Sequence, residues 1–108
     1  MKDKAQKLIE KYEELESELG NPDVLADQAR YNKIHKQYKG IEKAVQKAKE
    51  YLQLVNDLAE YKAALGDPDP EMVAMAKSEI SEIEKKLPSV TDELQILMVP
   101  KDPWDYRN

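Results

Sequence analysis

The chain has 108 residues, of which 36% are charged and 41% apolar, with three glycines and no phenylalanine. This length and composition indicate one domain built from long solvated helices rather than from a β-sheet or around a thick core. The absence of cysteine excludes disulfides and thiolate metal sites, and the net charge of −5 argues against a domain that clamps nucleic acid with its whole surface.

The first predicted helix covers residues 3–19. Its apolar residues recur at helical spacing, which places them on one face. They are Ala5, Leu8, Tyr12, Leu15 and Leu19. Asp3 and Gln6 have the spacing of a capping box at the start of this helix. Gly20 is expected to end it in the left-handed conformation that glycine favours after a helix.

The second predicted helix covers residues 27–65. Either Asn21-Pro22 or Asp27 is suited to cap the segment after the first helix, so residues 22–26 are expected to form a short helical turn. The apolar stripe of the second helix consists of Tyr31, Ile34, Tyr38, Ile41, Val45, Ala48, Leu52, Val55 and Ala59. Its later half carries a second seam made of Tyr51, Leu54, Leu58, Tyr61 and Leu65.

The third predicted helix covers residues 70–98. Asp69 stands at its N-cap and Pro70 at its first position, both of which suit those residue types. Its stripe consists of Val73, Ala76, Ile80, Ile83, Leu87, Val90, Leu94 and Leu97. The link at residues 66–70 is short, so the second and third helices are expected to be antiparallel neighbours.

Pro88 conflicts with the third helix, because a proline in a helix interior costs ~3 kcal/mol. The apolar stripe nevertheless crosses it without losing its phase. We therefore favour one kinked helix over a break at which Ser89 or Thr91 would cap a new helix.

Together these elements predict an all-α fold, an elongated antiparallel three-helix bundle or coiled coil. At 1.5 Å per residue the second helix is about 58 Å long and the first about 25 Å, so the first covers only part of the second and the third runs back along most of it. Gly40 either permits close approach of a neighbouring helix or has no structural role. Tyrosines and methionines on or near the seams are expected to pack at the core edge: Tyr12, Tyr31, Tyr38, Tyr51, Tyr61, Met72, Met75 and Met98.

The repeat stops between Pro100 and Pro103, and the single tryptophan, Trp104, lies just beyond. Prolines do not continue a helix, so the chain leaves the bundle here. We expect a helical bundle domain over residues 1–99 and a linker over residues 100–108 that leads toward a downstream domain absent from this chain.

Residues 30–49 concentrate positive charge, with seven basic residues against the single acid Glu42. Five of them form the candidate partner-contact strip: Lys33, Lys36, Lys39, Lys43 and Lys47. One interpretation is that these lysines pair with the acidic first helix and keep the second helix soluble. The other is that the strip meets RNA phosphate or an acidic protein by releasing counterions. Nothing indicates sequence-specific DNA binding.

No set of residues indicates catalysis. His35 is the only histidine and has no acid three or four residues away, so neither a catalytic triad nor a di-iron site can be built on it. The glutamates of the first helix are expected to form a solvated face, and no Gly-rich phosphate loop occurs. We predict no catalytic, cofactor-binding or metal-binding residue, no cofactor and no enzyme, which disfavours a small hydrolase built on a bundle.

Three segments resemble the N-terminal helical domain of the bacterial peptide chain release factor 1 family. They are Leu97-Met98-Val99-Pro100-Lys101-Asp102-Pro103 with Asp105, Arg107 and Asn108, then Ala26-Asp27-Gln28-Ala29-Arg30-Tyr31, and Gly66-Asp67-Pro68-Asp69-Pro70-Glu71-Met72. They lie in the family's order and at compatible distances, so the resemblance covers essentially the whole chain.

The resemblance implies a translation termination factor whose full-length form binds the ribosome, recognises the stop codons UAA and UAG, and promotes peptidyl-tRNA hydrolysis. It implies contact with the stalk base and GTPase-associated centre of the large subunit, and with the GTPase that recycles the factor. The codon-reading motif and the Gly-Gly-Gln loop of such factors do not occur in this chain. The alternative is a free-standing helical coiled-coil interaction module of the chaperone or scaffold type.

No apolar run approaches the ~20 residues that cross a bilayer, and residues 1–7 lack the apolar core of a signal peptide. The lack of cysteine fits a reducing compartment. We therefore expect a cytoplasmic protein without a membrane partner.

Overall fold

The computed structural model describes residues 1–99, which form helices and, within that range, no strand. The helices are α1 (Lys2–Leu19), α2 (Pro22–Leu25), α3 (Gln28–Gly40), α4 (Glu42–Ala64) and α5 (Pro70–Met98). The predicted all-α class is confirmed. The predicted linker at residues 100–108 lies outside the described residues.

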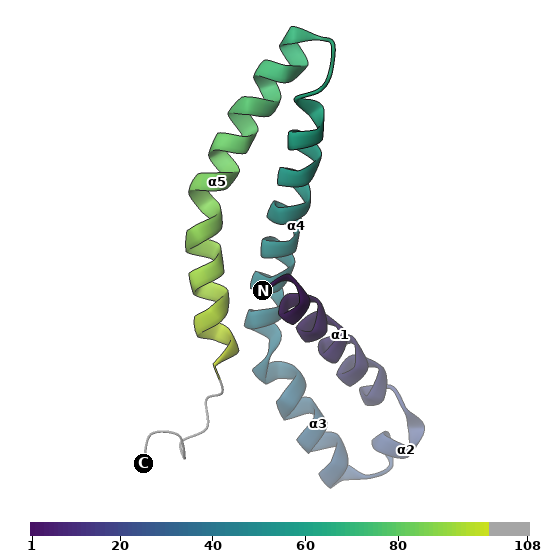
Figure 1. Ribbon diagram of the computed structural model, residues 1–108. Coiled ribbons are helices and arrows are strands. Elements are labelled where there is room, and N and C mark those ends of the chain that lie inside the picture. The colour runs from purple at the N-terminus through teal and green to yellow at the C-terminus, as the bar shows by residue number, and fades with distance from the viewer. Residues whose placement is uncertain (100–108) are drawn as a thin grey trace.

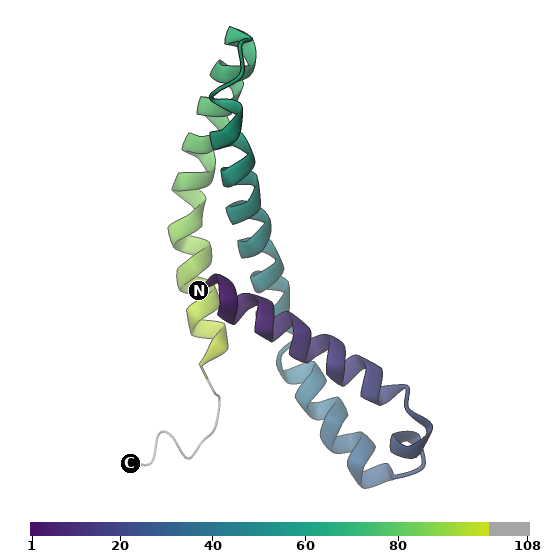
Figure 2. The ribbon, with the colours of Figure 1, turned by 45° about the vertical axis from the view of Figure 1, so that its right-hand side comes forward.

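The helices form two arms that meet at a waist. Figures 1 and 2 show α4 and α5 side by side as one long antiparallel hairpin, with α1, α2 and α3 forming a second hairpin that diverges from it. The molecule measures 61 × 39 × 16 Å, and its radius of gyration is 19.1 Å. A compact domain of this size has a radius of gyration of about 13 Å, so the predicted elongation is confirmed.

The waist is where the two arms share one buried cluster. Ala5 of α1, Ala48 of α4 and Leu94 of α5 are each fully buried there. The two alanines have short side chains, which lets α1 and α4 approach closely where they cross. The molecule is therefore three helices thick over part of its length, as predicted.

A second buried cluster holds the α1–α3 arm together. It contains Leu15 of α1, Val24 of α2 and Ile34 of α3. The short helix α2 therefore closes the end of this arm by burying its valine between the two longer helices. The predicted helical turn at residues 22–26 is confirmed.

The single helix predicted over residues 27–65 is wrong, because the chain bends between α3 and α4. Ile41 has φ −104° and ψ 1°, outside the helical range. Gly40, just before it, is a poor helix former, and a Cβ there would meet nothing within 4 Å, so close approach does not explain this glycine. The bend lets α3 pack on α1 while α4 packs on α5, and α5 makes no contact with α3.

The α5 helix is continuous through Pro88, which confirms the preference for one helix over a break. The hydroxyl of Thr91 donates a hydrogen bond of 2.7 Å to the carbonyl oxygen of Leu87. Thr91 therefore bonds within the helix instead of capping a new one.

Two of the predicted helix boundaries are confirmed by their caps. Asp27 accepts a hydrogen bond from the Arg30 amide at the start of α3. Asp69, the residue before Pro70, accepts one from the Glu71 amide at the start of α5.

Two other boundary predictions are wrong. Helix α1 begins at Lys2 after Met1 without a side-chain cap, so Asp3 lies inside its first turn and forms no capping box. Gly20 has φ −94° rather than a left-handed conformation. Its amide donates to Ser17 and the Asn21 amide donates to Glu18, which closes the helix end without a change of hand.

The predicted core-edge residues divide by position. The five tyrosines are half-buried, as expected. Met72 and Met75, however, are 40% and 41% exposed near the tip of the α4–α5 hairpin, where only two helices are present to cover them. The prediction that these two methionines are packing residues at the core edge is wrong, whereas Met98 packs against the waist cluster.

Candidate functional site

Three of the five strip lysines line one hollow, here called the corner groove. It lies where α3 turns into α4 beside the end of α5, and its volume is about 630 Å³. Lys36, Lys39 and Lys43 line it together with Leu8, Gly40, Ile41, Glu42, Ala44, Leu97, Met98 and Val99. The bend at residues 40–41 creates this hollow, because a straight helix would carry α3 and α4 along one axis.

The corner groove carries net positive charge. The ammonium group of Lys39 lies 3.3 Å from the Glu42 carboxylate, the one acid that lines the groove. Lys36 and Lys43 are exposed and form no ion pair with any residue in the range 1–99. Two lysines of the groove are therefore available to an external anion.

Lys47 has a structural position instead. Its ammonium group lies 2.7 Å from Glu93 of α5 and 3.0 Å from Glu50 of its own helix. These hydrogen bonds, with Glu93 first, raise the pKa of Lys47, and the bond to Lys47 lowers the pKa of Glu93. Lys47 thus links α4 to α5. Lys33 is exposed on α3 and does not line the groove.

The interpretation that the strip lysines pair with the acidic first helix is wrong, since no ion pair within residues 1–99 joins them to α1. A tyrosine makes that connection. The Tyr38 hydroxyl of α3 donates a hydrogen bond of 2.9 Å to the Glu16 carboxylate of α1, and its ring stacks on Tyr12 at 4.3 Å. Hydrogen bonding with Tyr12 and then with Glu16 raises the pKa of Tyr38 above its usual range.

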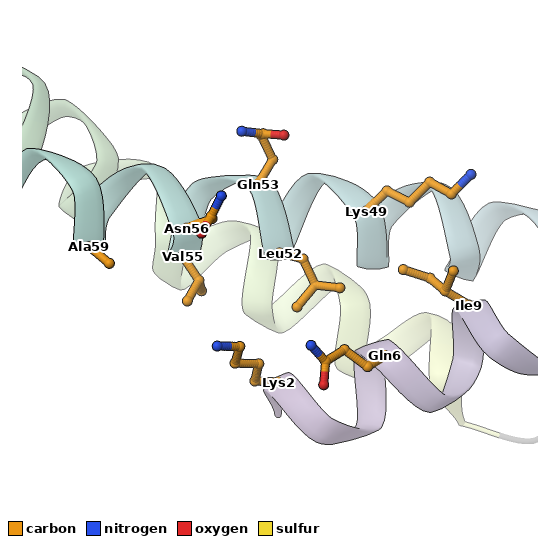
Figure 3. Close-up of a pocket in the computed structure, with 9 residues that line it drawn as sticks. All are labelled: Lys2, Gln6, Ile9, Lys49, Leu52, Gln53, Val55, Asn56 and Ala59. Carbon is orange, nitrogen blue, oxygen red and sulfur yellow. The ribbon is translucent and has the colours of Figure 1, made fainter.

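A second hollow, here called the wedge, lies between α1 and α4. Its volume is about 550 Å³ (Figure 3). It is lined by Lys2, Gln6 and Ile9 of α1 and by Lys49, Leu52, Gln53, Val55, Asn56 and Ala59 of α4. Two lysines and three carboxamides surround apolar side chains there, and no carboxylate lines it. Sequence reasoning missed this site, because its two halves are 40 or more positions apart in the chain.

The remaining candidate side chain is His35. His35 is exposed, and its ring stacks on Tyr31 with centroids 5.9 Å apart. Residues 1–99 hold no group of three side chains arranged to bind a metal ion. No helix in that part of the chain is long and apolar enough to cross a membrane.

The chain is similar to known proteins over almost all of its length. The family model of the PCRF domain matches residues 8–108. Peptide chain release factor 1 of Oleidesulfovibrio alaskensis is 43% identical over 105 residues, and that of Aliarcobacter butzleri is 38% identical over 108 residues. These matches cover 97% and 100% of this chain but only 29% and 30% of the relatives, so the chain spans less than a third of their length. No solved structure matches it.

Proposed function

Because the chain belongs to the PCRF domain family, we propose that it is the ribosome-docking helical domain of a translation termination factor of the release factor 1 kind. The full-length factor recognises the stop codons UAA and UAG and promotes peptidyl-tRNA hydrolysis. Both acts belong to parts outside this chain, whose three glycines are isolated and form no Gly-Gly-Gln loop. The domain itself positions the factor and performs no catalysis.

The corner groove is the observation that best supports a docking role. Lys36 and Lys43 are free of internal ion pairs within residues 1–99 and lie on the walls of a concave surface. Phosphate groups that settle there release counterions, which supplies affinity without sequence readout. Lys39 adds to the positive electrostatic potential in the groove, and Lys33 and Lys47 add to that potential from a greater distance. We assign the predicted strip this role as the ribosomal RNA contact.

The partner on the ribosome is the stalk base and GTPase-associated centre of the large subunit, and the recycling GTPase acts on the same complex. The site of action is the cytoplasm, where translation terminates. Residues 1–99 form the folded body, and residues 100–108 connect it to the rest of the factor.

The alternative of a free-standing coiled-coil module is less favoured. Helical periodicity alone supports both functions equally, because heptad-like stripes occur in many interaction proteins. The family match over residues 8–108 is specific to the first.

Charge reversal in the corner groove tests the proposal. In the Lys36→Glu/Lys43→Glu variant, affinity for purified large ribosomal subunits should fall at least about tenfold, and the slope of log K against log salt should become shallower by about 1.5. Helix content by circular dichroism should not change, because both side chains are exposed.

The matched control is Lys77→Glu/Lys86→Glu, which makes the same charge change at exposed positions of α5 away from the groove. This control should keep nearly all of the affinity. An equal loss in both variants, or no loss in either, would return the strip to the role of a solvated face.

A further inference from the structure

We propose that the wedge binds one unpaired nucleotide of RNA, with adenine preferred. The carboxamides of Gln6 and Asn56 would read the edge of the base, the apolar side chains of Leu52 and Val55 would support its face, and the ammonium groups of Lys2 and Lys49 would neutralise its phosphate. This inference rests on the proposed function, because it names a second and selective RNA contact of the same domain.

The wedge is formed where α1 crosses α4. Figure 3 shows Leu52 and Val55 pointing from α4 toward α1, while Lys2 and Gln6 rise from α1 toward α4. The hollow extends from Lys2, Gln6 and Ile9 of α1 along α4 as far as Ala59, which is exposed. The result is a hollow with an apolar floor and a polar rim, and its volume of about 550 Å³ falls in the range of sites that hold small molecules.

The polar groups of the rim are not engaged elsewhere in the described part of the chain. Gln6, Asn56, Lys2 and Lys49 make no side-chain hydrogen bond or ion pair within residues 1–99. The third carboxamide, Gln53, differs. It donates a hydrogen bond of 2.8 Å to Asp57 and points away from α1 in Figure 3.

This set of groups suits a nucleotide better than other anions. A carboxamide offers one donor and one acceptor side by side, which matches the N6 and N7 edge of adenine. Flipped or unpaired bases are commonly held between apolar side chains and read by hydrogen bonds. The lack of any lining carboxylate leaves the lysine charge free for phosphate and disfavours a basic peptide. A base in a duplex is stacked and paired, so only an unpaired nucleotide can enter.

The wedge and the corner groove therefore differ in what they select. The corner groove is lined by lysines and one glutamate but by no carboxamide, so we expect it to attract anions without distinguishing bases. The wedge adds hydrogen-bonding groups that distinguish bases. Variants in the two sites should consequently have separable effects.

The test compares two RNA probes by fluorescence anisotropy: a stem-loop with an adenine-rich loop and a fully paired duplex of the same length. The unaltered chain should bind the stem-loop about tenfold more tightly than the duplex. In the Gln6→Leu/Asn56→Leu variant that preference should disappear, while affinity for the duplex and its salt dependence stay the same. Leucine is a good helix former, so both exposed positions should remain helical.

The control variant is Gln53→Leu, which removes a carboxamide from the rim of the wedge at a side chain that points away from α1. It should keep the preference for the stem-loop. Equal binding of the two probes by the unaltered chain, or an equal loss of preference in the control, would overturn the inference. So would displacement of the stem-loop by polyglutamate at the same charge concentration, because that would show attraction to negative charge alone.

Two further arms separate the possible sources and failures. In the first, the affinity for adenosine monophosphate is compared with the affinity for the stem-loop. If the two are equal, the ligand is a free nucleotide and the assignment to RNA is overturned. If large ribosomal subunits still bind through Lys36 and Lys43 but the stem-loop preference is absent, this inference fails while the proposed function stands. Loss of ribosome binding altogether would count against the proposed function itself.

Discussion

Individual side chains at the waist decide whether the two arms stay together. Leu94 is fully buried against Ala5 and Ala48, whereas Ile96, two positions away on the same helix, is 70% exposed. Burial of a leucine is stabilising because its apolar surface leaves water, and the surrounding helices cannot collapse fully into the space it leaves. The stability of the domain should therefore depend strongly on Leu94 and only weakly on Ile96.

Leu94→Ala should lower the free energy of unfolding by about 2–4 kcal/mol, the usual cost of a buried leucine-to-alanine change. The change Ile96→Ala should alter it by no more than about 0.5 kcal/mol. Urea denaturation followed by circular dichroism measures both. Similar costs at the two positions would mean that the waist cluster is not the main source of stability.

The Lys47–Glu93 pair predicts how stability depends on pH. The pKa of Glu93 is lowered from 4.5, so its contribution is present above pH 4.5 and is lost as the pH falls below that value. The pKa of Lys47 is raised from 10.5, so its contribution is present below pH 10.5 and is lost as the pH rises through the higher value in the folded state.

The Glu93→Gln variant should therefore melt below the unaltered chain at pH 7, and the difference in Tm should shrink toward pH 3 and in 1 M salt. The effect should be modest, since the Lys47 and Glu93 side chains are 25% and 52% exposed. Glu82→Gln, which breaks the exposed 3.7 Å pair with Lys85, serves as the comparison and should show no such dependence. A pH-independent difference for Glu93→Gln would point to packing instead of charge.

At the scale of elements, the bend between α3 and α4 determines the shape of the corner groove. Glycine at position 40 weakens the helix locally, but it has no left-handed conformation and no close neighbour that requires it. The bend is better explained by packing, because α1 holds α3 in one direction while α5 holds α4 in another. The glycine accordingly permits the bend without causing it.

Gly40→Ala should consequently raise the free energy of unfolding by about 0.5–1 kcal/mol, since alanine restricts the unfolded chain and a Cβ fits in open space. Affinity for large ribosomal subunits should stay unchanged because the groove persists. Thermal melting and the binding assay report the two effects. A lower Tm, or weaker binding at equal stability, would show that the bend needs glycine.

The helices were predictable from the sequence where one local signal dominated. Asp69 and Pro70 mark the start of α5 by their own chemistry, and the stripe through Pro88 correctly indicated a continuous helix. The bend at Ile41 was missed because the apolar stripe keeps its period across it, so only competition between tertiary contacts reveals it. The strip lysines lie close together in sequence, so their concentration of charge is visible there, although only three of the five line the corner groove. The wedge depends on where α1 crosses α4, which no local pattern records.

At the scale of the whole molecule, charge is separated along the chain. Residues 12–27 contain six acids and no base, residues 30–49 contain seven bases and one acid, and residues 57–84 contain eight acids and two lysines. The tip of the α4–α5 hairpin should therefore repel RNA, whereas the basic residues of α3 and of the start of α4 should attract it. This distribution favours orientations in which the corner groove faces a phosphate surface, even though the net charge of the chain is negative.

The same waist should be the most stable part of the molecule. In α4 the buried residues are Ala44, Val45 and Ala48, all near its start, and no residue between positions 49 and 75 is buried. Local opening is easiest where few apolar contacts hold a segment. Native-state hydrogen exchange should give interior amides at residues 46–50 at least about tenfold more protection than those at residues 58–63. The Leu94→Ala change should reduce protection at the waist toward that of the hairpin tip. Equal protection along α4 in the unaltered chain would instead mean that the α4–α5 hairpin opens as one unit and that the waist is not its most stable part.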